Sequence, residues 1–134
     1  MYQKCYKNFS KLIRQLNDYL LERKIGEFNN LEQSGLKTQF QLSFDLMWKL
    51  LRDYLDDQET EIGLISPKNV LRVAASSVLL EKIGVSGEIL MNALLARNEL
   101  VHIYDYENAQ DVLEKIQTIF VPEMKEVERY FDEK

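Results

Sequence analysis

The sequence predicts an all-α protein whose helices pack as a bundle. Apolar residues recur at helical spacing through five segments, and no segment shows the strict alternation of a strand. Only two prolines and five glycines occur in 134 residues, so long stretches are free of helix breakers. Hydrophobic residues make up 46% of the chain, which is enough for a core. A chain of this length fits one domain, so we expect residues 1–134 to form a single helical bundle.

The first predicted helix spans about residues 2–25. Gly26 and the pair Asn29-Asn30 then break the pattern and end the helix. The apolar positions that define its buried face are Tyr2, Tyr6, Phe9, Leu12, Ile13, Leu16 and Leu20.

The second predicted helix runs from about Leu31 or Gly35 to Asp56, and its apolar arc is unusually wide. One face carries Leu36, Phe40, Phe44, Met47, Trp48, Leu51 and Leu55, while Leu42, Leu46 and Leu50 lie on a different side. A helix with only one buried face does not need so many apolar positions. We therefore expect this helix to be central, or to be covered by a second subunit.

The third predicted helix follows a polar, acidic loop over residues 57–65. Ser66-Pro67 is a good helix start, with the serine as cap and the proline at the first helical position. This helix should continue to about Ile83 and stop at Gly84.

Two further helices complete the expected bundle. Ser86 can cap a fourth helix over residues 87–103, and Asp105 can cap a fifth that reaches about Tyr130. Pro122 lies inside the fifth helix and should kink or interrupt it. Antiparallel helices joined by short loops give a four- or five-helix bundle.

Composition excludes several classes of protein. The net charge of −5 argues against a surface that is basic all over, so any contact with nucleic acid would be local. No apolar run is long enough for a membrane span, and residues 1–10 lack the apolar stretch of a signal peptide. Cys5 is the only cysteine and no Cys/His cluster could hold zinc, so we expect a cytoplasmic protein without a cofactor or a bound metal.

The most informative stretch surrounds the only histidine. Arg97 and His102 form an R-x4-H pair, and Tyr104 follows. Imidazole transfers protons near neutral pH, and guanidinium holds phosphate through two hydrogen bonds, so the pair suits phosphodiester chemistry. On an ideal helix His102 lies well round from Arg97, so convergence requires a helix end there or a second subunit. The alternative is structural, with a partly buried histidine and an arginine in a salt bridge.

Other patterns in the chain allow both a functional and a structural interpretation. Glu99 and His102 form a Glu-x-x-His pattern, which can ligate iron in helical bundles, but a complete site would need a second copy of the motif. Trp48 is typical of a core residue more than of a base-stacking platform. A basic stripe on the first helix could contact phosphates or could simply be the solvated face: Lys4, Lys7, Lys11 and Arg14.

Several motifs in order resemble one known family. Residues 97–104, with the pattern RN-x3-H-x-Y, are similar to the signature of the nucleotidyltransferase substrate-binding proteins of the HEPN superfamily. Ser66-Pro67-Lys68-x-Val70-x-Arg72 resembles the family's S-P-R-x-V-x-R segment, and Asn108-Ala109 matches its closing pattern. The second predicted helix resembles the family's G…F…F-E-L-x-W-K helix through Gly35, Phe40, Phe44, Asp45, Leu46, Trp48 and Lys49. The resemblance covers about residues 31–120.

The resemblance implies a fold and an assembly. The fold is an up-and-down four-helix bundle with an extra helix, similar to the helical domain of kanamycin nucleotidyltransferase. The protein is expected to form a homodimer and to associate with a minimal nucleotidyltransferase encoded by an adjacent gene.

The resemblance also implies two alternative functions. In the first, the pair is a toxin–antitoxin module, and this chain is a metal-independent ribonuclease with catalytic Arg97 and His102, supported by Asn98. The nucleotidyltransferase would then silence it by transferring AMP to Tyr104. In the second, the chain is a non-catalytic substrate-binding subunit that completes the nucleotidyltransferase. The net negative charge and the apolar Leu100-Val101 beside His102 favour the second.

Overall fold

The computed structural model describes residues 2–102 and 106–134, and the side chains of all of them except 106–108. Within these ranges every regular element is a helix, and none is a strand. The predicted all-α class is therefore confirmed.

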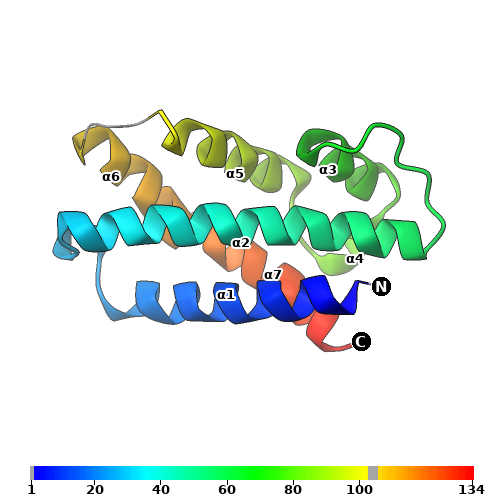
Figure 1. The fold of residues 1–134 in the computed structure, drawn as a ribbon, viewed down its shortest axis with the longest axis horizontal. Helices are drawn as coiled ribbons and strands as arrows, with labels where there is room; N and C mark the ends of the chain where they lie inside the picture. Colours follow the sequence, from blue (N-terminus) through cyan, green and yellow to red (C-terminus); the bar gives the residue numbers. More distant parts are fainter. Residues whose placement is uncertain (1, 103–105) are drawn as a thin grey trace.

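Four long helical segments run up and down the molecule (Figure 1). α1 (Gln3–Glu22) leads through a short 3₁₀ turn, η1 (Ile25–Glu27), into α2 (Asn30–Asp57). α5 (Gly87–Leu100) runs back along α2. The fourth segment is continuous and consists of α6 (Tyr106–Lys115), the π-helical turn η2 (Ile116–Phe120) and α7 (Val121–Asp132). Two shorter helices, α3 (Pro67–Ser76) and α4 (Leu79–Ile83), join α2 to α5.

Side-chain caps begin three of the helices, two of them at serines that the sequence predicts as caps. Asn29 Oδ1 accepts a hydrogen bond from the backbone N–H of Glu32 at 2.8 Å, and Oε1 of Glu32 accepts one from the backbone N–H of Asn29 at 2.9 Å. Ser66 Oγ and Ser86 Oγ each accept one from the backbone N–H three residues later, both at 3.2 Å. These bonds satisfy donors that a helix start leaves free. The predicted caps Ser66 and Ser86 are confirmed.

The prediction of one continuous helix from Pro67 to Ile83 is wrong, because the chain turns at Val78. This residue has φ 61° and ψ 9°, which is left-handed backbone. Just before it, the hydroxyls of Ser76 and Ser77 donate to backbone carbonyls three residues earlier, at 3.3 and 3.4 Å. Such bonds compete with the regular helical pattern. The turn redirects the chain so that the apolar residues of α4 reach the core.

The ends of the other helices lie closer to their predicted positions. α5 ends at Leu100, three residues before its predicted end. The interruption expected around Pro122 is present as η2, the π-helical turn directly before α7. Proline has no N–H to donate to the carbonyl four residues earlier, so a wider turn at this point costs little.

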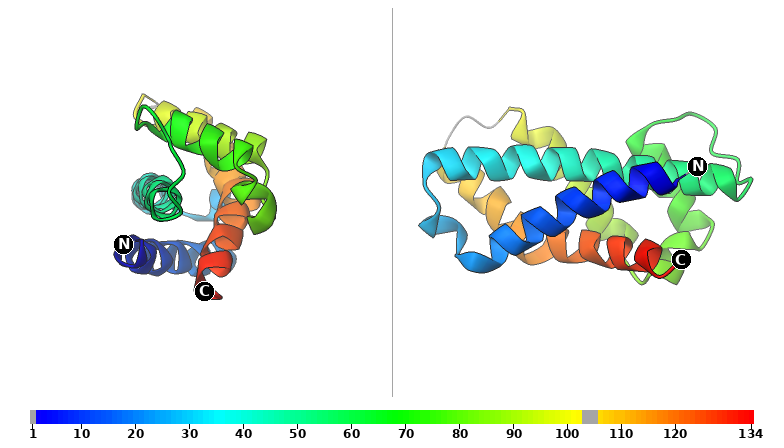
Figure 2. Two further views of the ribbon diagram at one scale, coloured as in Figure 1. Left: turned by 90° about the vertical axis from the view of Figure 1, so that its right-hand side faces the viewer. Right: turned by 60° about the horizontal axis from the view of Figure 1, so that its bottom comes forward.

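The core surrounds α2, which contacts α1, α3, α5, α6 and α7. The two views in Figure 2 show the other helices on several sides of it. Its fully buried side chains include Phe40, Phe44, Met47 and Leu50. This central position accounts for most of the wide apolar arc. Leu42 remains an exception, with 48% of its surface exposed.

A buried carboxylate joins the first and last helices. Glu128 on α7 is only 3% exposed, and its oxygens accept from Arg14 at 2.9 Å and from Lys125 at 2.8 Å. Next to it, the Tyr6 hydroxyl donates to Asp132 at 2.7 Å. Burial alone would raise the pKa of Glu128, but the hydrogen bonds from Arg14 and Lys125 outweigh it and hold the pKa below its ordinary value. Burial and the bond to Asp132 raise the pKa of Tyr6 to about 12.

Candidate functional site on helix α5

Arg97 lies in the last turn of α5 and is held by Asp45 of α2. Its Nε donates to Oδ1 of Asp45 at 3.1 Å, and its Nη2 donates to Oδ2 at 2.9 Å. The two side chains are 34% and 28% exposed, so the pair lies at the edge of the core and reaches solvent. A two-point contact of this kind fixes the plane of the guanidinium as well as its position.

Asn98 also contacts Arg97. Its Oδ1 accepts from Nη1 of Arg97 at 3.2 Å, and the residue is exposed. Two of the predicted site residues are therefore in direct contact, and three of the five N–H groups of the guanidinium are occupied.

His102 lies two residues after the end of α5. Its backbone N–H donates to the carbonyl of Glu99 at 2.8 Å, which closes a final turn, and its side chain is exposed. The helix end that convergence with Arg97 requires is thus present. Among the described residues, no hydrogen bond or ion pair joins the imidazole to Arg97. The predicted acceptor Tyr104 lies outside the described residues.

Mostly apolar grooves flank α5 on both sides. A groove of about 550 Å³ lies between α5 and the α6–η2 segment and includes Leu95, Val112 and Ile119 among its lining residues. A second groove, of about 580 Å³, lies between α5 and the start of α3 and is lined in part by Met91, Leu95 and Asn98. Leu95 lines both grooves and is 55% exposed. Asn98, which contacts Arg97, therefore lies beside an exposed apolar surface.

Arg14 and Cys5 both make structural contacts. Arg14 of the basic stripe is paired with Glu128, whereas Lys4, Lys7 and Lys11 are exposed. The Cys5 thiol donates to the carbonyl of Leu46 at 3.6 Å, and burial raises its pKa, which disfavours the reactive thiolate.

Neither a metal site nor a membrane-spanning helix is found among the described residues. In the part of the chain that the structure describes, no group of three or more His, Cys, Asp or Glu side chains could hold a metal ion. Of the helices described, none has both the length and the apolar character needed to cross a bilayer.

Sequence reasoning did not assign a role to Asp45. It is a polar residue of α2, 52 residues before Arg97, so spacing along the chain gives no sign that the two meet. The available signal was its place within the F-D-L-x-W-K segment of the second helix, which resembles a family motif.

Comparison with known families identifies the chain as a whole. A family model described as "nucleotidyltransferase substrate binding protein like" matches residues 4–133. The chain belongs to this family. No curated protein matches its sequence. The family name associates its members with a nucleotidyltransferase, and both α5 and the Asp45–Arg97 pair fall inside the matched residues.

Proposed function

We propose that this chain is the partner subunit of a minimal nucleotidyltransferase in a toxin–antitoxin pair, and that it is itself a metal-independent ribonuclease of the HEPN type. The observation that carries the proposal is the fixed guanidinium of Arg97 at the solvent-facing end of α5, five residues before an exposed histidine. The active unit would be residues 1–134 as one domain.

Arg97 would hold the phosphate of the RNA backbone. Asp45 and Asn98 together accept from three of its five N–H groups, which leaves one N–H on each terminal nitrogen for a ligand. Those two donors match two oxygens of a phosphate and would stabilise the charge that builds on it in the transition state. Asp45 is then a positioning residue, because it acts on the RNA only through Arg97.

His102 would move the protons. Its imidazole would take the proton of the ribose 2′-hydroxyl, the 2′-oxygen would attack phosphorus, and the bond to the 5′-oxygen would break. The departing 5′-oxygen then needs a proton, which the protonated imidazole can return. Every proton and bond in this step is accounted for without a metal ion.

The test is RNA cleavage by purified single-residue variants. His102→Ala and Arg97→Lys should each lower the rate at least about a hundredfold, since general acid–base catalysis and charge stabilisation each contribute about that much. Glu88→Gln, at an exposed position of the same helix, should cleave like the wild type. Circular dichroism would verify that all variants remain folded. Cleavage by His102→Ala at the wild-type rate would refute the proposed ribonuclease activity.

The nucleotidyltransferase would silence the toxin by transferring AMP to Tyr104. The chain is co-expressed with its gene neighbour, supplied with ATP and weighed by intact-mass spectrometry. We expect an added AMP that is absent from Tyr104→Phe and retained by Tyr106→Phe, the nearest tyrosine in the sequence.

A non-catalytic substrate-binding subunit is the second candidate, and the two grooves beside α5 favour it. In that case the chain would complete the nucleotidyltransferase and help to hold a third molecule. Co-purification of the two proteins with an unchanged mass, together with no RNA cleavage, would support this function over the first. If the two proteins never associate, both candidates fail.

A further inference from the structure

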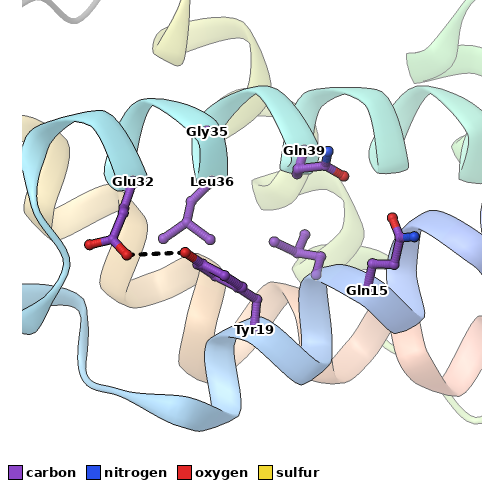
Figure 3. A pocket seen from close by; sticks show the side chains of 7 residues that line it. Gln15, Tyr19, Glu32, Gly35, Leu36 and Gln39 are labelled. Carbon is purple, nitrogen blue, oxygen red and sulfur yellow. Dashed lines mark hydrogen bonds between the residues drawn. The ribbon is translucent and has the colours of Figure 1, made fainter.

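Two cavities away from α5 differ in the chemistry that they offer a ligand. One lies between α1 and α2, where Tyr19 donates to Glu32 at 3.1 Å (Figure 3). Arg23 also donates to this carboxylate at 2.7 Å, and Glu32 is the only charged side chain among the described lining residues. Its charge is therefore used within the protein, and this cavity favours no class of ligand. The second cavity is lined by Tyr54 of α2 and Tyr130 of α7, and these two rings already contact an ammonium group.

Tyr54 and Tyr130 hold the side-chain ammonium of Lys134. Its Nζ lies 4.7 Å from the centre of the Tyr130 ring and 5.4 Å from the centre of the Tyr54 ring. Both distances are within the range of cation–π attraction. Hydrogen bonds with Tyr54 and Tyr130 raise the pKa of Lys134 above its ordinary value, so the group keeps its charge. The tyrosine pair is thus a place where this protein already binds an alkylammonium group.

Other aromatic side chains fix the two rings. Phe131, which is 3% exposed, lies edge-on to both, with its ring centre 5.1 Å from that of Tyr54 and 5.2 Å from that of Tyr130. Tyr2 packs edge-on against Tyr54 at 5.1 Å. Lys134, in contrast, is exposed and has a long, flexible side chain. The rings can therefore exchange one ammonium group for another without rearrangement of the core.

The surroundings of the tyrosine pair favour positive charge. Residues 53–61 contain five acidic residues and no basic one. Tyr54 and Tyr130 lie in the last turns of α2 and α7, where the carbonyls of a helix end carry partial negative charge. Among the described residues that line the cavity, Lys82 is the only basic one. The acidic groups therefore outnumber Lys82 and Lys134, and a ligand with several positive charges is complementary to this end of the molecule.

The size of the cavity limits the shape of the ligand. Its volume is about 140 Å³, below the usual range for small-molecule sites. Leu55 and Leu79 supply apolar surface, and Gln58, Thr60 and Ser77 supply oxygen atoms that can accept from an ammonium group. Such a space suits a thin alkyl chain better than a nucleotide.

We propose that Tyr54 and Tyr130 bind one ammonium group of a linear polyamine, and that Lys134 competes for the same place. One ammonium would replace that of Lys134 at the two rings. The methylene chain would follow the cavity, and a second ammonium would reach the carboxylates of residues 53–61. This site shares no residue with the candidate site on α5, so it would remain if the proposed ribonuclease failed.

The experiment titrates spermidine into the full chain at about 0.15 M salt, followed by chemical-shift changes in NMR spectra. Lys134→Ala should bind spermidine at least about threefold more tightly than the wild type, because removing a competitor raises the apparent affinity. Lys115→Ala removes the same charge from α6, at the other end of the α6–α7 segment (Figure 1). It should change the affinity by less than about twofold, because salt screens a distant charge.

Two further comparisons test the rings and the carboxylates separately. Tyr130→Leu should weaken the binding of spermidine at least about threefold, whereas Tyr130→Phe keeps the aromatic face and should stay within about twofold of the wild type. Circular dichroism would verify that both variants are folded. Butylamine has a single ammonium group and should bind at least about tenfold more weakly than spermidine, because it cannot reach the rings and the carboxylates together.

Any of four results would overturn the proposal. The first is no binding of spermidine to either the wild type or Lys134→Ala, and the second is equal affinity in Lys134→Ala and Lys115→Ala. The third is equal affinity in folded Tyr130→Leu and Tyr130→Phe, and the fourth is binding of butylamine as tight as that of spermidine. His102→Ala should bind spermidine like the wild type, so the polyamine site and the ribonuclease can each fail without the other.

Discussion

Carboxylates hold two important arginines of this protein in place. Asp45 fixes Arg97 at the candidate site, where both side chains are about one-third exposed. Glu128 fixes Arg14 at the α1–α7 contact, where the carboxylate is almost completely buried. Exposed ion pairs contribute little to stability, whereas charged hydrogen bonds to a buried group contribute more. We therefore assign orientation to the first pair and stability to the second.

The stability contribution of Glu128 should depend on pH. Its pKa is lower in the folded protein than its ordinary value of 4.5. A lowered pKa means that the contribution is complete above pH 4.5 and is lost as the pH falls through the folded-state value. Glu128→Gln should lower the free energy of unfolding by about 1–3 kcal/mol at pH 7, and the difference from wild type should shrink in acid.

Urea unfolding at pH 7 and at a pH below the ordinary glutamate value would measure this. The matched control is Glu126→Gln on the same helix, which removes an exposed pair with Arg129 and should cost less than about 1 kcal/mol at either pH. A deficit of Glu128→Gln that stays the same in acid would show that the carboxylate charge is not what stabilises this contact.

At the scale of elements, local chemistry decides where helices begin, while packing decides where they break. The starts at Pro67 and Gly87 were predicted because a serine precedes and caps each of them, and Asn29 caps the start at Asn30 in the same way. The break at Val78 is not, because valine disfavours left-handed backbone and nothing adjacent in sequence requires it. Burial of Leu79 and Leu80 accounts for the break, and this becomes visible only in three dimensions.

Val78→Gly should stabilise the protein. Left-handed backbone costs a β-branched residue roughly 1–2 kcal/mol, and glycine avoids this cost at the expense of some entropy in the unfolded chain. Val78 is 48% exposed, so little buried surface is lost. We expect a gain of about 0.5–1 kcal/mol in the free energy of unfolding by urea titration. Gly84→Ala, at φ 89°, should change it in the opposite direction, and the same sign for both would contradict the backbone argument.

At the scale of the whole molecule, the sequence predicted the class, the bundle and the central second helix. It also located Arg97, Asn98 and His102 within one segment, because their motif is local. It could not find Asp45 as the partner of Arg97 or the cavity between α1 and α2. Both depend on how distant residues meet when the bundle packs, and periodicity within one helix carries no information about that.

The central position of α2 predicts very different costs for two leucines of the same helix. Leu50 is fully buried, whereas Leu42 is 48% exposed. Leu50→Ala should lower the free energy of unfolding by about 2–5 kcal/mol, and Leu42→Ala by less than about 1 kcal/mol. Thermal or urea unfolding would compare them. Similar costs for the two would mean that another chain covers Leu42 in solution.

The exposed face of α5 predicts how copies of the chain assemble. A homodimer of the kind that the family resemblance implies would cover Leu95, which lines both grooves beside the helix. Leu95→Glu should convert a dimer to a monomer in size-exclusion chromatography with light scattering, because a charge placed in an apolar interface is costly. Leu21→Glu, at a more exposed position on α1, should leave the mass unchanged. A dimer that tolerates Leu95→Glu does not use this face.

The hydrogen bond from Tyr6 to Asp132 and the ion pair from Arg14 to Glu128 join residues 126 and 114 positions apart. Contacts so distant in sequence are expensive to close and form late in folding. During synthesis, α1 leaves the ribosome long before α7 has been made, so it can pair at first only with α2. The seam between the first and last helices should therefore close after translation has passed residue 132, and until then the nascent chain presents the α7-facing side of α1 to chaperones.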